Sequence, residues 1–329
     1  MHRTNVSKSH SPSPLRSRLS AAILGFGLVM SPAAHAQEAP EQLTIVSGSP
    51  GGSWYPIAAG IAQVFGQEGV RANAEVGAGL TNMIKVSRGE AELGVTTSTI
   101  PPVAEAGEEP FDESIRNVRA LAVLFPSYAH IAVTEDSGIE SIEGLAGASF
   151  NTTAVGNSTQ AAFVDILTSY GMEESEVETS RGSQSHAANA VKDGNLDGLT
   201  LLSAFPNGTY TELFSSHDMK LLSLKAEAIE QITQDNPGYS AATIPAGSYP
   251  GQEEDVQTVR SDLLLIANAD MPEAEAQWVV QTLLANIESI RGIHAIMADV
   301  SAEYMASVSG LELHPGAAAA YTEAGVDLD

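Results

Sequence analysis

The sequence has 329 residues, no Cys, and a formal net charge of −26, with 15 Lys and Arg against 41 Asp and Glu. Nucleic acids and anionic membrane surfaces are bound by clustered Lys and Arg, so this balance argues against both as partners. The lack of Cys excludes disulfides, thiolate metal sites and a Cys nucleophile. The length suits one large domain or two lobes with a sizeable core.

The N-terminal residues have the pattern of a secretory signal peptide. Residues 1–18 contain basic side chains and no acid, an apolar run follows from Leu19 to Met30, and Ala34-His35-Ala36 comes next. The apolar run is shorter than the about 20 residues that a membrane-spanning helix needs. We therefore predict a signal peptide over residues 1–36, cleaved near Ala36, and a periplasmic product. A retained membrane anchor is the alternative.

Short β-rich runs alternate with helical periodicity along the rest of the chain. Residues 43–46 are followed by a Gly- and Ser-rich turn and then by apolar residues at helical spacing from Ile57 to Phe65. Residues 72–84 and 149–171 repeat this order of strand, polar turn and helix. The pattern predicts an α/β fold with largely parallel sheets, in which ligands bind at the carboxyl ends of the strands.

The domain organisation has to be inferred without a Pro- or Ser-rich linker. Two lobes would then be joined by strands, and the candidates are residues 121–133 and 263–268. We place the first part of lobe 1 at residues 37–126, lobe 2 at residues 127–268, and a return to lobe 1 at residues 269–329. The return is predicted to begin with one long helix that extends from Pro272 past Ile290.

Motifs for catalysis are missing from the sequence. It contains no G-x-S-x-G, no H-E-x-x-H and no Walker lysine loop, and Gly77-Ala78-Gly79 is only half of a dinucleotide-binding pattern. The histidines after the signal show no metal-ligand spacing and are better interpreted as surface or capping residues. We therefore predict a protein that is not an enzyme, with no catalytic residues, no metal and no cofactor.

Two polar turns that precede helices are the remaining candidates for a site. Residues 49–53 and 156–159 are rich in Gly, Ser, Thr and Asn. Such turns can direct backbone N–H groups and a helix N-terminus at an anion. Each turn alone can equally be an ordinary helix N-cap. Their presence in two separate halves of the chain favours a binding cleft.

Several stretches together resemble the TAXI family, the solute receptors of one branch of the tripartite ATP-independent periplasmic (TRAP) transporters. The matching stretches are residues 47–56, Asn82 with residues 87–93, and residues 118–126, 136–139, 191–194, 205–207, 244–252 and 314–316. They cover nearly the whole chain after the signal, in order. The most specific is Pro245-Ala246-Gly247-Ser248-Tyr249-Pro250-Gly251-Gln252.

The resemblance implies a type 2 periplasmic-binding-protein fold, in which two α/β lobes surround a ligand cleft. It also implies a small organic anion as ligand, such as glutamate or another dicarboxylate, and a TRAP-type membrane permease as partner, with uptake driven by an ion gradient. We expect a monomer. A ligand-presenting periplasmic sensor and a secreted hydrolase that uses cleft carboxylates are the alternative functions.

The resemblance also suggests ligand-binding residues, position by position. They are Gly52, Ser53, Trp54, Tyr55, Asn82, Thr97, Ser98, Thr153, Asn157, Ser158, Thr159, Ser203 and Phe205. Trp54 and Tyr55 can instead cap the core of a lobe, and Asn82 can be an N-cap. Trp54 and Asn157 depart from the commoner family pattern, which leaves the identity of the ligand open.

Arg181 is added for a chemical reason. It precedes a predicted helix start, and a guanidinium can hold a carboxylate through two parallel hydrogen bonds. The competing interpretation is a surface ion pair, since acidic side chains are abundant in this chain.

Overall fold

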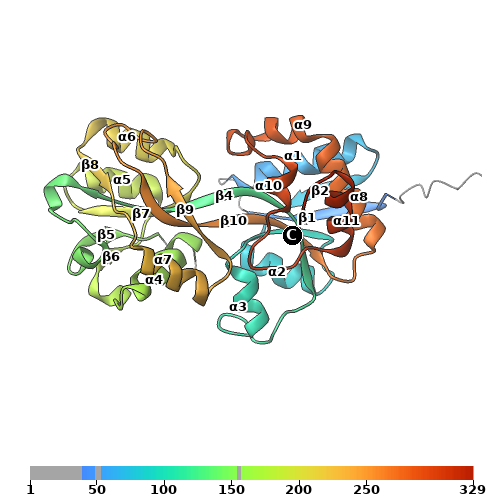
Figure 1. Ribbon diagram of the computed structural model, residues 1–329, viewed down its shortest axis with the longest axis horizontal. Helices are drawn as coiled ribbons and strands as arrows, with labels where there is room; N and C mark the ends of the chain where they lie inside the picture. The colour runs from blue at the N-terminus through green and yellow to red at the C-terminus, as the bar shows by residue number, and fades with distance from the viewer. Residues whose placement is uncertain (1–38, 49–52, 154–156, 329) are drawn as a thin grey trace, which may run out of the picture. The chain divides into compact units, whose positions relative to one another are not determined.

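Two long strands that pair with each other organise the backbone. In the computed structural model, which describes residues 39–48, 53–153 and 157–328, β4 (Val118–Thr134) runs antiparallel to β10 (Val256–Asn268). Figure 1 shows both strands passing between two groups of helices and strands. The predicted crossing segments, residues 121–133 and 263–268, fall within these two strands. The predicted signal peptide lies outside the described residues.

Each group of elements forms an α/β lobe (Figure 1). Lobe 1 contains β1 (Gln42–Val46), β2 (Arg71–Glu75), β3 (Leu93–Thr97), α1 (Trp54–Gln67), α2 (Gly79–Ser87), α3 (Ile100–Ala106), α8 (Glu273–Ala285), α9 (Ile287–Ile293), α10 (Ala302–Ala306) and α11 (Pro315–Glu323). Lobe 2 contains β5 (Ser149–Asn151), β6 (Glu178–Ser180), β7 (Gly198–Ser203), β8 (Met219–Leu221), β9 (Tyr239–Ile244), α4 (Ser158–Ser169), α5 (Gln184–Lys192), α6 (Gly208–Ser216) and α7 (Ala226–Asp235). No helix among the described residues combines the length and the apolar character needed to cross a membrane.

Helices cover both faces of the sheet in each lobe, because successive strand residues point to opposite faces. In β1, Ile45 joins the apolar cluster under α1 and α8, whereas Val46 joins the cluster under α2 and α3. In lobe 2, α4 and α7 cover one face and α5 and α6 the other. Each lobe therefore has its own two-sided core.

The sheet is mixed rather than largely parallel, which corrects the prediction from the sequence. Parallel pairing joins β1 to β2 and β3, and β5 to β6 and β7. The crossing strands are antiparallel to every strand they pair with, because β4 leaves lobe 1 and β10 returns to it. The sequence pattern of these two long apolar strands does not encode their direction.

A third connection between the lobes lies beside the crossing strands. The Ser98 hydroxyl, just after β3, donates to the Gly238 carbonyl oxygen at 2.5 Å and accepts from the Asp262 N–H at 2.9 Å. Asn236, at the end of α7, donates to the Thr99 carbonyl oxygen at 3.0 Å. These hydrogen bonds hold the end of β3 against lobe 2. The lobes are therefore joined by the two crossing strands, β4 and β10, and by this third, hydrogen-bonded contact.

The long helix predicted after Pro272 is wrong in its extent. The structure has two helices there, α8 and α9, which are separated at Asn286. Asn286 adopts φ −108° and ψ 26°, and its side chain donates to the Thr282 carbonyl oxygen at 3.0 Å. An Asn side chain can compete with backbone N–H groups for a carbonyl oxygen in this way. Asn286 therefore interrupts the helix, although the apolar spacing of the sequence continues through it.

His130 is buried in lobe 2 and is neither a surface nor a capping residue, contrary to the prediction for the histidines. Its Nδ1 bonds to the Tyr128 carbonyl oxygen at 2.8 Å, so this nitrogen carries the proton. Its Nε2 then accepts from the Tyr249 hydroxyl at 2.9 Å, and that hydroxyl accepts from the Asn207 N–H at 3.1 Å. Burial lowers the pKa of His130 to about 4. Tyr249 of the specific motif thus holds the lobe 2 core together.

We expect the stability of the protein to fall as the pH drops from 6.5 toward 4 because of His130. Its folded pKa of about 4 lies below the ordinary 6.5, so the unfolded state binds the extra proton in this window. The contribution lost is up to about 3 kcal/mol. Urea unfolding of the wild type and of His130→Gln across this pH range measures it. An equal pH slope in both proteins would contradict this assignment.

The close approach of backbones at Gly238 gives a second prediction. A Cβ at this position would lie 2.6 Å from Thr99 Cα and against the Ser98 carbonyl group, which is backbone that cannot move aside cheaply. Gly238→Ala should therefore destabilise the protein by about 1–3 kcal/mol. Gly66→Ala is the control, since a Cβ there meets nothing within 4 Å and should stabilise α1 by about 0.5–1 kcal/mol. Thermal unfolding of both variants measures these changes, and a Gly238→Ala variant as stable as the wild type would contradict the prediction.

Candidate functional site: a cavity between the lobes

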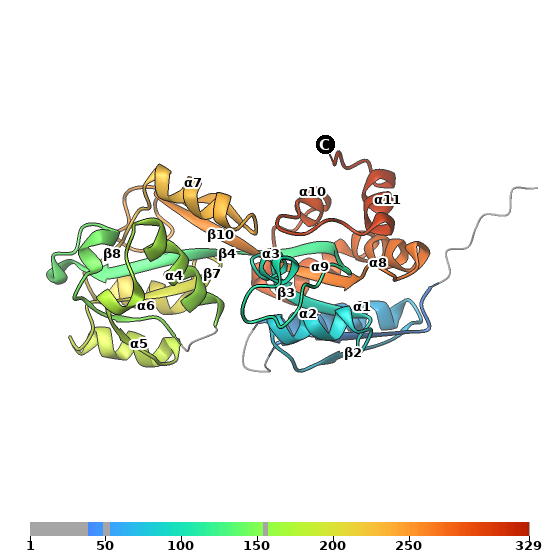
Figure 2. The same ribbon diagram turned by 90° about the horizontal axis from the view of Figure 1, so that it is seen from below.

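A cavity of about 750 Å³ lies where the two lobes face each other. Lobe 1 contributes the ends of β1 and β3 and the starts of α1, α2 and α3, and lobe 2 contributes α4, the end of β7 and the Asn236–Tyr239 turn. Figure 2 shows the lobe 2 helices around one end of the crossing strands and α2 and α3 at the other end. Six of the sequence-predicted residues line this cavity, namely Ser53, Trp54, Thr97, Asn157, Ser158 and Thr159.

The N-terminus of α4 forms part of the lobe 2 wall. Asn157 caps the helix, and its side-chain oxygen accepts from the Thr159 N–H at 2.9 Å. The Thr159 hydroxyl accepts from the Leu202 N–H at 3.1 Å, which ties the helix start to the end of β7. Ser158 is the first helical residue, and helix geometry leaves its N–H without an intrahelical partner. The wall therefore carries the positive end of a helix dipole.

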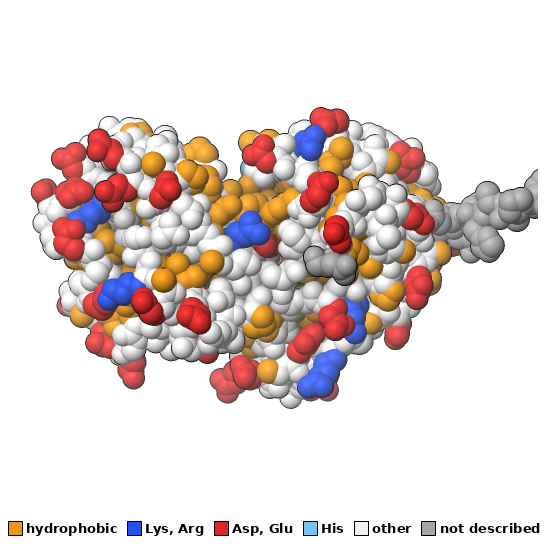
Figure 3. All heavy atoms as spheres, in the orientation of Figure 1, with side chains coloured by type: hydrophobic (Ala, Val, Ile, Leu, Met, Phe, Trp, Pro, Cys, Tyr) orange, Lys and Arg blue, Asp and Glu red, His pale blue; other side chains and the backbone are white. Residues whose placement is uncertain are grey.

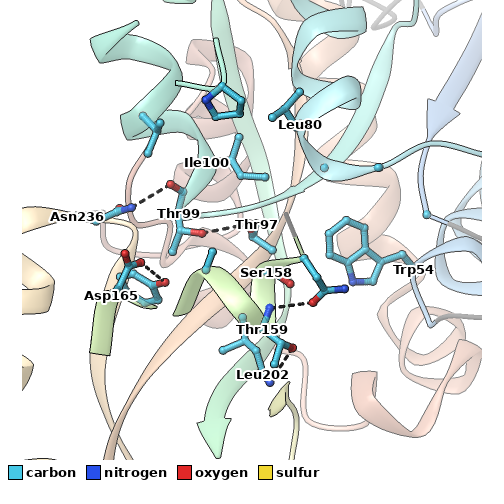
Figure 4. A pocket seen from close by; sticks show the side chains of 18 of the residues that line it. Trp54, Leu80, Thr97, Thr99, Ile100, Ser158, Thr159, Asp165, Leu202 and Asn236 are labelled. Carbon is cyan, nitrogen blue, oxygen red and sulfur yellow. Dashed lines mark hydrogen bonds between the residues drawn. The ribbon is translucent and has the colours of Figure 1, made fainter. Parts of the chain in front are cut away.

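Glycines bring the backbone of lobe 1 close to the same cavity. A Cβ at Gly48 would lie 2.8 Å from Trp54 Cβ, and one at Gly79 would lie 2.9 Å from Ile100 Cδ1. The half-pattern Gly77-Ala78-Gly79 thus serves close packing at the start of α2, and Ser53 and Trp54 begin α1 beside it. Figure 4 shows the Trp54 ring on the side of the cavity opposite Asp165.

The third helix of lobe 1 at the cavity is a poor source of N–H groups. Pro101 and Pro102 occupy the first turn of α3, and proline has no N–H. The side chains Ile100 and Val103, together with Phe111 and Leu80, form an apolar part of the lining. Backbone N–H donors therefore lie toward α1, α2 and α4, and the α3 side combines these apolar side chains with Thr99 and Glu109.

No described residue that lines the cavity is a Lys, an Arg or a His. Two lining residues are acidic, Asp165 and Glu109. The Asp165 carboxylate accepts from the Tyr239 hydroxyl at 2.7 Å, and burial raises its pKa above the ordinary value. Figure 3 shows Asp and Glu side chains spread over this face of both lobes, with few Lys and Arg among them. Positive potential inside the cavity has to come from helix ends and N–H groups.

Asn82 lies outside the cavity lining and is fully buried. Its amide nitrogen donates at 2.7 Å to the carbonyl oxygens of both Ser47 and Val95, and its oxygen accepts from the Ala78 N–H at 3.2 Å. It is not the N-cap of α2, which is Ala78. The side chain joins the ends of β1 and β3 to the start of α2, so it positions backbone that borders the cavity.

Arg181 also lies outside the cavity lining. Its guanidinium is within 2.8 Å of the Glu174 carboxylate and donates to the Thr152 hydroxyl at 2.6 Å. The side chain is one-third exposed. From the sequence, Arg181 had two interpretations, a guanidinium that holds a ligand carboxylate and a surface ion pair. The geometry corresponds to the ion pair.

The other sequence-predicted residues have different surroundings. Tyr55 lines a separate groove of about 720 Å³ between α1 and α9. Ser98 belongs to the third connection between the lobes, Ser203 bonds to the Ala204 carbonyl oxygen, and the Phe205 ring packs against Tyr128 with centroids 4.6 Å apart. Thr153 adopts φ 63° at the edge of the described chain, and Gly52 lies outside the described residues.

Sequence reasoning missed three polar lining residues of lobe 2, Asp165, Asn236 and Tyr239. Asp165 follows Ser158 by seven residues and Ala161 by four, which places all three on one face of a helix. The spacing can be read from the sequence, but with 41 Asp and Glu in the chain it did not single out Asp165. Asn236 and Tyr239 come from a turn whose position depends on the return of β9 beside β10.

Comparisons with known proteins agree with this architecture. XAC2383 from Xanthomonas citri bound to ATP is 12% identical, with 86% of this chain and 95% of that chain covered and a TM-score of 0.53. The periplasmic aliphatic sulphonate binding protein SsuA from Escherichia coli is 15% identical, with 87% and 84% covered and a TM-score of 0.47. A putative L-cystine ABC transporter from Listeria monocytogenes is 13% identical, with 80% and 98% covered and a TM-score of 0.46.

At these identities the likeness concerns the fold alone. The two α/β lobes and the mixed sheet that joins them define the class, which is a two-lobed α/β fold. The pattern of the NMT1-like family matches residues 45–325, and the chain belongs to this family.

Asn82 and Arg181 should differ in their effect on stability. Asn82→Ala leaves two buried carbonyl oxygens and one N–H without this partner, so we expect a loss of about 2–4 kcal/mol in the free energy of unfolding. Arg181→Ala removes a partly exposed ion pair and should cost about 1 kcal/mol or less. Urea unfolding compares them, and an equal cost would refute the positioning role of Asn82.

Proposed function

We propose that this protein is a periplasmic solute-binding protein that captures a small organic anion between its lobes and delivers it to a membrane permease. The observation that carries the proposal is the convergence of the starts of α1, α2 and α4 on one cavity whose described lining has no basic side chain. Backbone N–H groups and helix dipoles stabilise an anion without a counter-ion. The absence of catalytic motifs in the sequence supports a receptor over an enzyme.

The paired crossing strands support a capture mechanism by closure. β4 and β10 connect the lobes side by side, and the Ser98–Gly238 and Asn236–Thr99 hydrogen bonds lie beside them. These contacts form one narrow junction, about which two rigid bodies can rotate. A ligand that contacts both walls stabilises the closed arrangement, because it binds that arrangement more tightly than the open one. Trp54 and Ser158 lie on different lobes and both border the cavity, so one anion can contact both.

The class of permease and the ligand are the finer parts of this proposal. The TAXI resemblance supports a TRAP-type permease and a carboxylate such as glutamate. The names of two structural relatives refer instead to a sulphonate and to an ABC transporter of L-cystine. The two classes of permease can be separated by measuring uptake in cells that carry this receptor with its own permease. When ATP is depleted and the ion gradient is maintained, uptake through an ABC transporter stops, whereas uptake through a TRAP-type permease continues.

The anion-binding role of α4 can be tested by removing one N–H. Ser158→Pro deletes the N–H at the first helical position, where proline is tolerated, and Asn157 has the extended backbone that a residue before proline prefers. We expect calorimetric affinity for organic anions such as glutamate, succinate and ethanesulfonate to fall by roughly tenfold or more.

Ser158→Ala is the matched control, because it removes the hydroxyl and keeps the N–H. It should lower the affinity by less than about fivefold. Equal affinities in wild type and Ser158→Pro, at unchanged thermal stability, would remove the α4 N-terminus from the site. An absence of binding by the wild type across the whole series would reject the proposed function itself.

A further inference from the structure

Asp165 places a negative charge in the cavity that no lining side chain compensates. One carboxylate oxygen accepts from the Tyr239 hydroxyl at 2.7 Å. Burial and, to a smaller extent, the negative charge of Asp235 at the end of α7 raise the pKa of Asp165. The described lining contains no Lys, Arg or His. Asp165 is partly buried, and a carboxylate withdrawn from water without a cation is destabilised, so the site favours a ligand that supplies one.

Tyr239 favours the ionised form of Asp165 rather than the protonated form. Its hydroxyl donates to the carboxylate, and this hydrogen bond opposes the rise of the Asp165 pKa that burial causes. Tyr239 is itself almost fully buried, and the bond fixes the orientation of the carboxylate toward the cavity. The geometry therefore offers a fixed carboxylate to the cavity, and a positively charged group bound beside it would offset the effect of burial.

The position of Asp165 on α4 sets its distance from the anion-binding end. Ser158, Ala161 and Asp165 line the cavity from one face of the helix. Seven residues at the helical rise separate Ser158 from Asp165 by about 10 Å along the axis. Figure 4 shows Asp165 on one side of the cavity, Trp54 on the other, and Ser158 between them. The helix thus presents a positive and a negative end at a fixed spacing.

Resting on the proposed function, we propose that the ligand is an organic zwitterion whose anionic group and ammonium group are separated by a spacer of several bonds, and that Asp165 with Tyr239 is the ammonium subsite. Ala161 between the two ends offers no polar side chain to the spacer. An α-amino acid without a charged side chain is too short to reach both ends. A longer ω-amino carboxylate satisfies both charges at once.

The proposal is tested with three probes of matched length: hexanoate, adipate and ε-aminohexanoate. The wild type should bind ε-aminohexanoate at least tenfold more tightly than hexanoate, and adipate most weakly, since its second carboxylate meets Asp165. Alanine, with its charges on one carbon, should bind no better than hexanoate. Calorimetry measures all four. Tighter binding of adipate than of ε-aminohexanoate overturns the proposal and assigns Asp165 as a protonated donor.

Asp165→Asn should abolish the preference for ε-aminohexanoate over hexanoate, and hexanoate should bind as well or better. Asp235→Asn is the matched control, because Asp235 is exposed, does not line the cavity and carries the same charge. It should keep the preference. A preference that survives Asp165→Asn overturns the subsite while the proposed function stands. No binding of any anion by the wild type overturns both.

The pH dependence gives an independent readout. An ammonium ligand needs ionised Asp165, so the ratio of the two affinities, ε-aminohexanoate over hexanoate, should fall as the pH drops through the raised pKa of Asp165. The ratio cancels the titration of the ligand carboxylates, which is similar in both probes. Asp165→Asn should make the ratio independent of pH. A ratio that rises on acidification of the wild type would contradict the subsite.

Discussion

The antiparallel pairing of β4 with β10 is the constraint on which the rest of the molecule depends. It makes one sheet out of two lobes, and it brings the ends of β3 and β7 to the same region from opposite directions. The Ser98 hydroxyl and the bare backbone of Gly238 complete this junction. Because polar strand ends and helix starts meet there, the cavity is a direct result of the topology.

The chemistry of the cavity depends mainly on backbone groups, because few charged side chains line it. Helix starts and glycines provide main-chain donors, and Asn82 holds the lobe 1 backbone in place from behind. The surface of the protein is strongly acidic, so an anion is attracted only where these local dipoles outweigh the overall charge. The partly buried carboxylate of Asp165 then makes the cavity bipolar rather than uniformly positive.

Local signals in the sequence were enough to predict the α/β fold and several elements of the described chain. Residues 43–46 form a strand, Ile57–Phe65 lie in a helix, and the two crossing segments lie in β4 and β10. Strand direction was not predictable, since a long apolar strand has the same pattern either way. The break at Asn286 was hidden by apolar spacing that continues through it, and the burial of His130 depended on partners far away in the sequence.

Lining residues at a polar turn and helix start, such as Ser53 and Ser158, could be predicted from the sequence. Lining residues whose position depends on strand pairing far away in the sequence, such as Asn236 and Tyr239, could not. Asp165, Ser158 and Thr97 stand outside all four apolar clusters of the described residues. Tyr239 and Trp54 line the same cavity, but Tyr239 belongs to one of these clusters and Trp54 packs against another. A change at Asp165 or Ser158 can therefore alter the cavity and leave the apolar core intact, whereas a change at Tyr239 or Trp54 affects both.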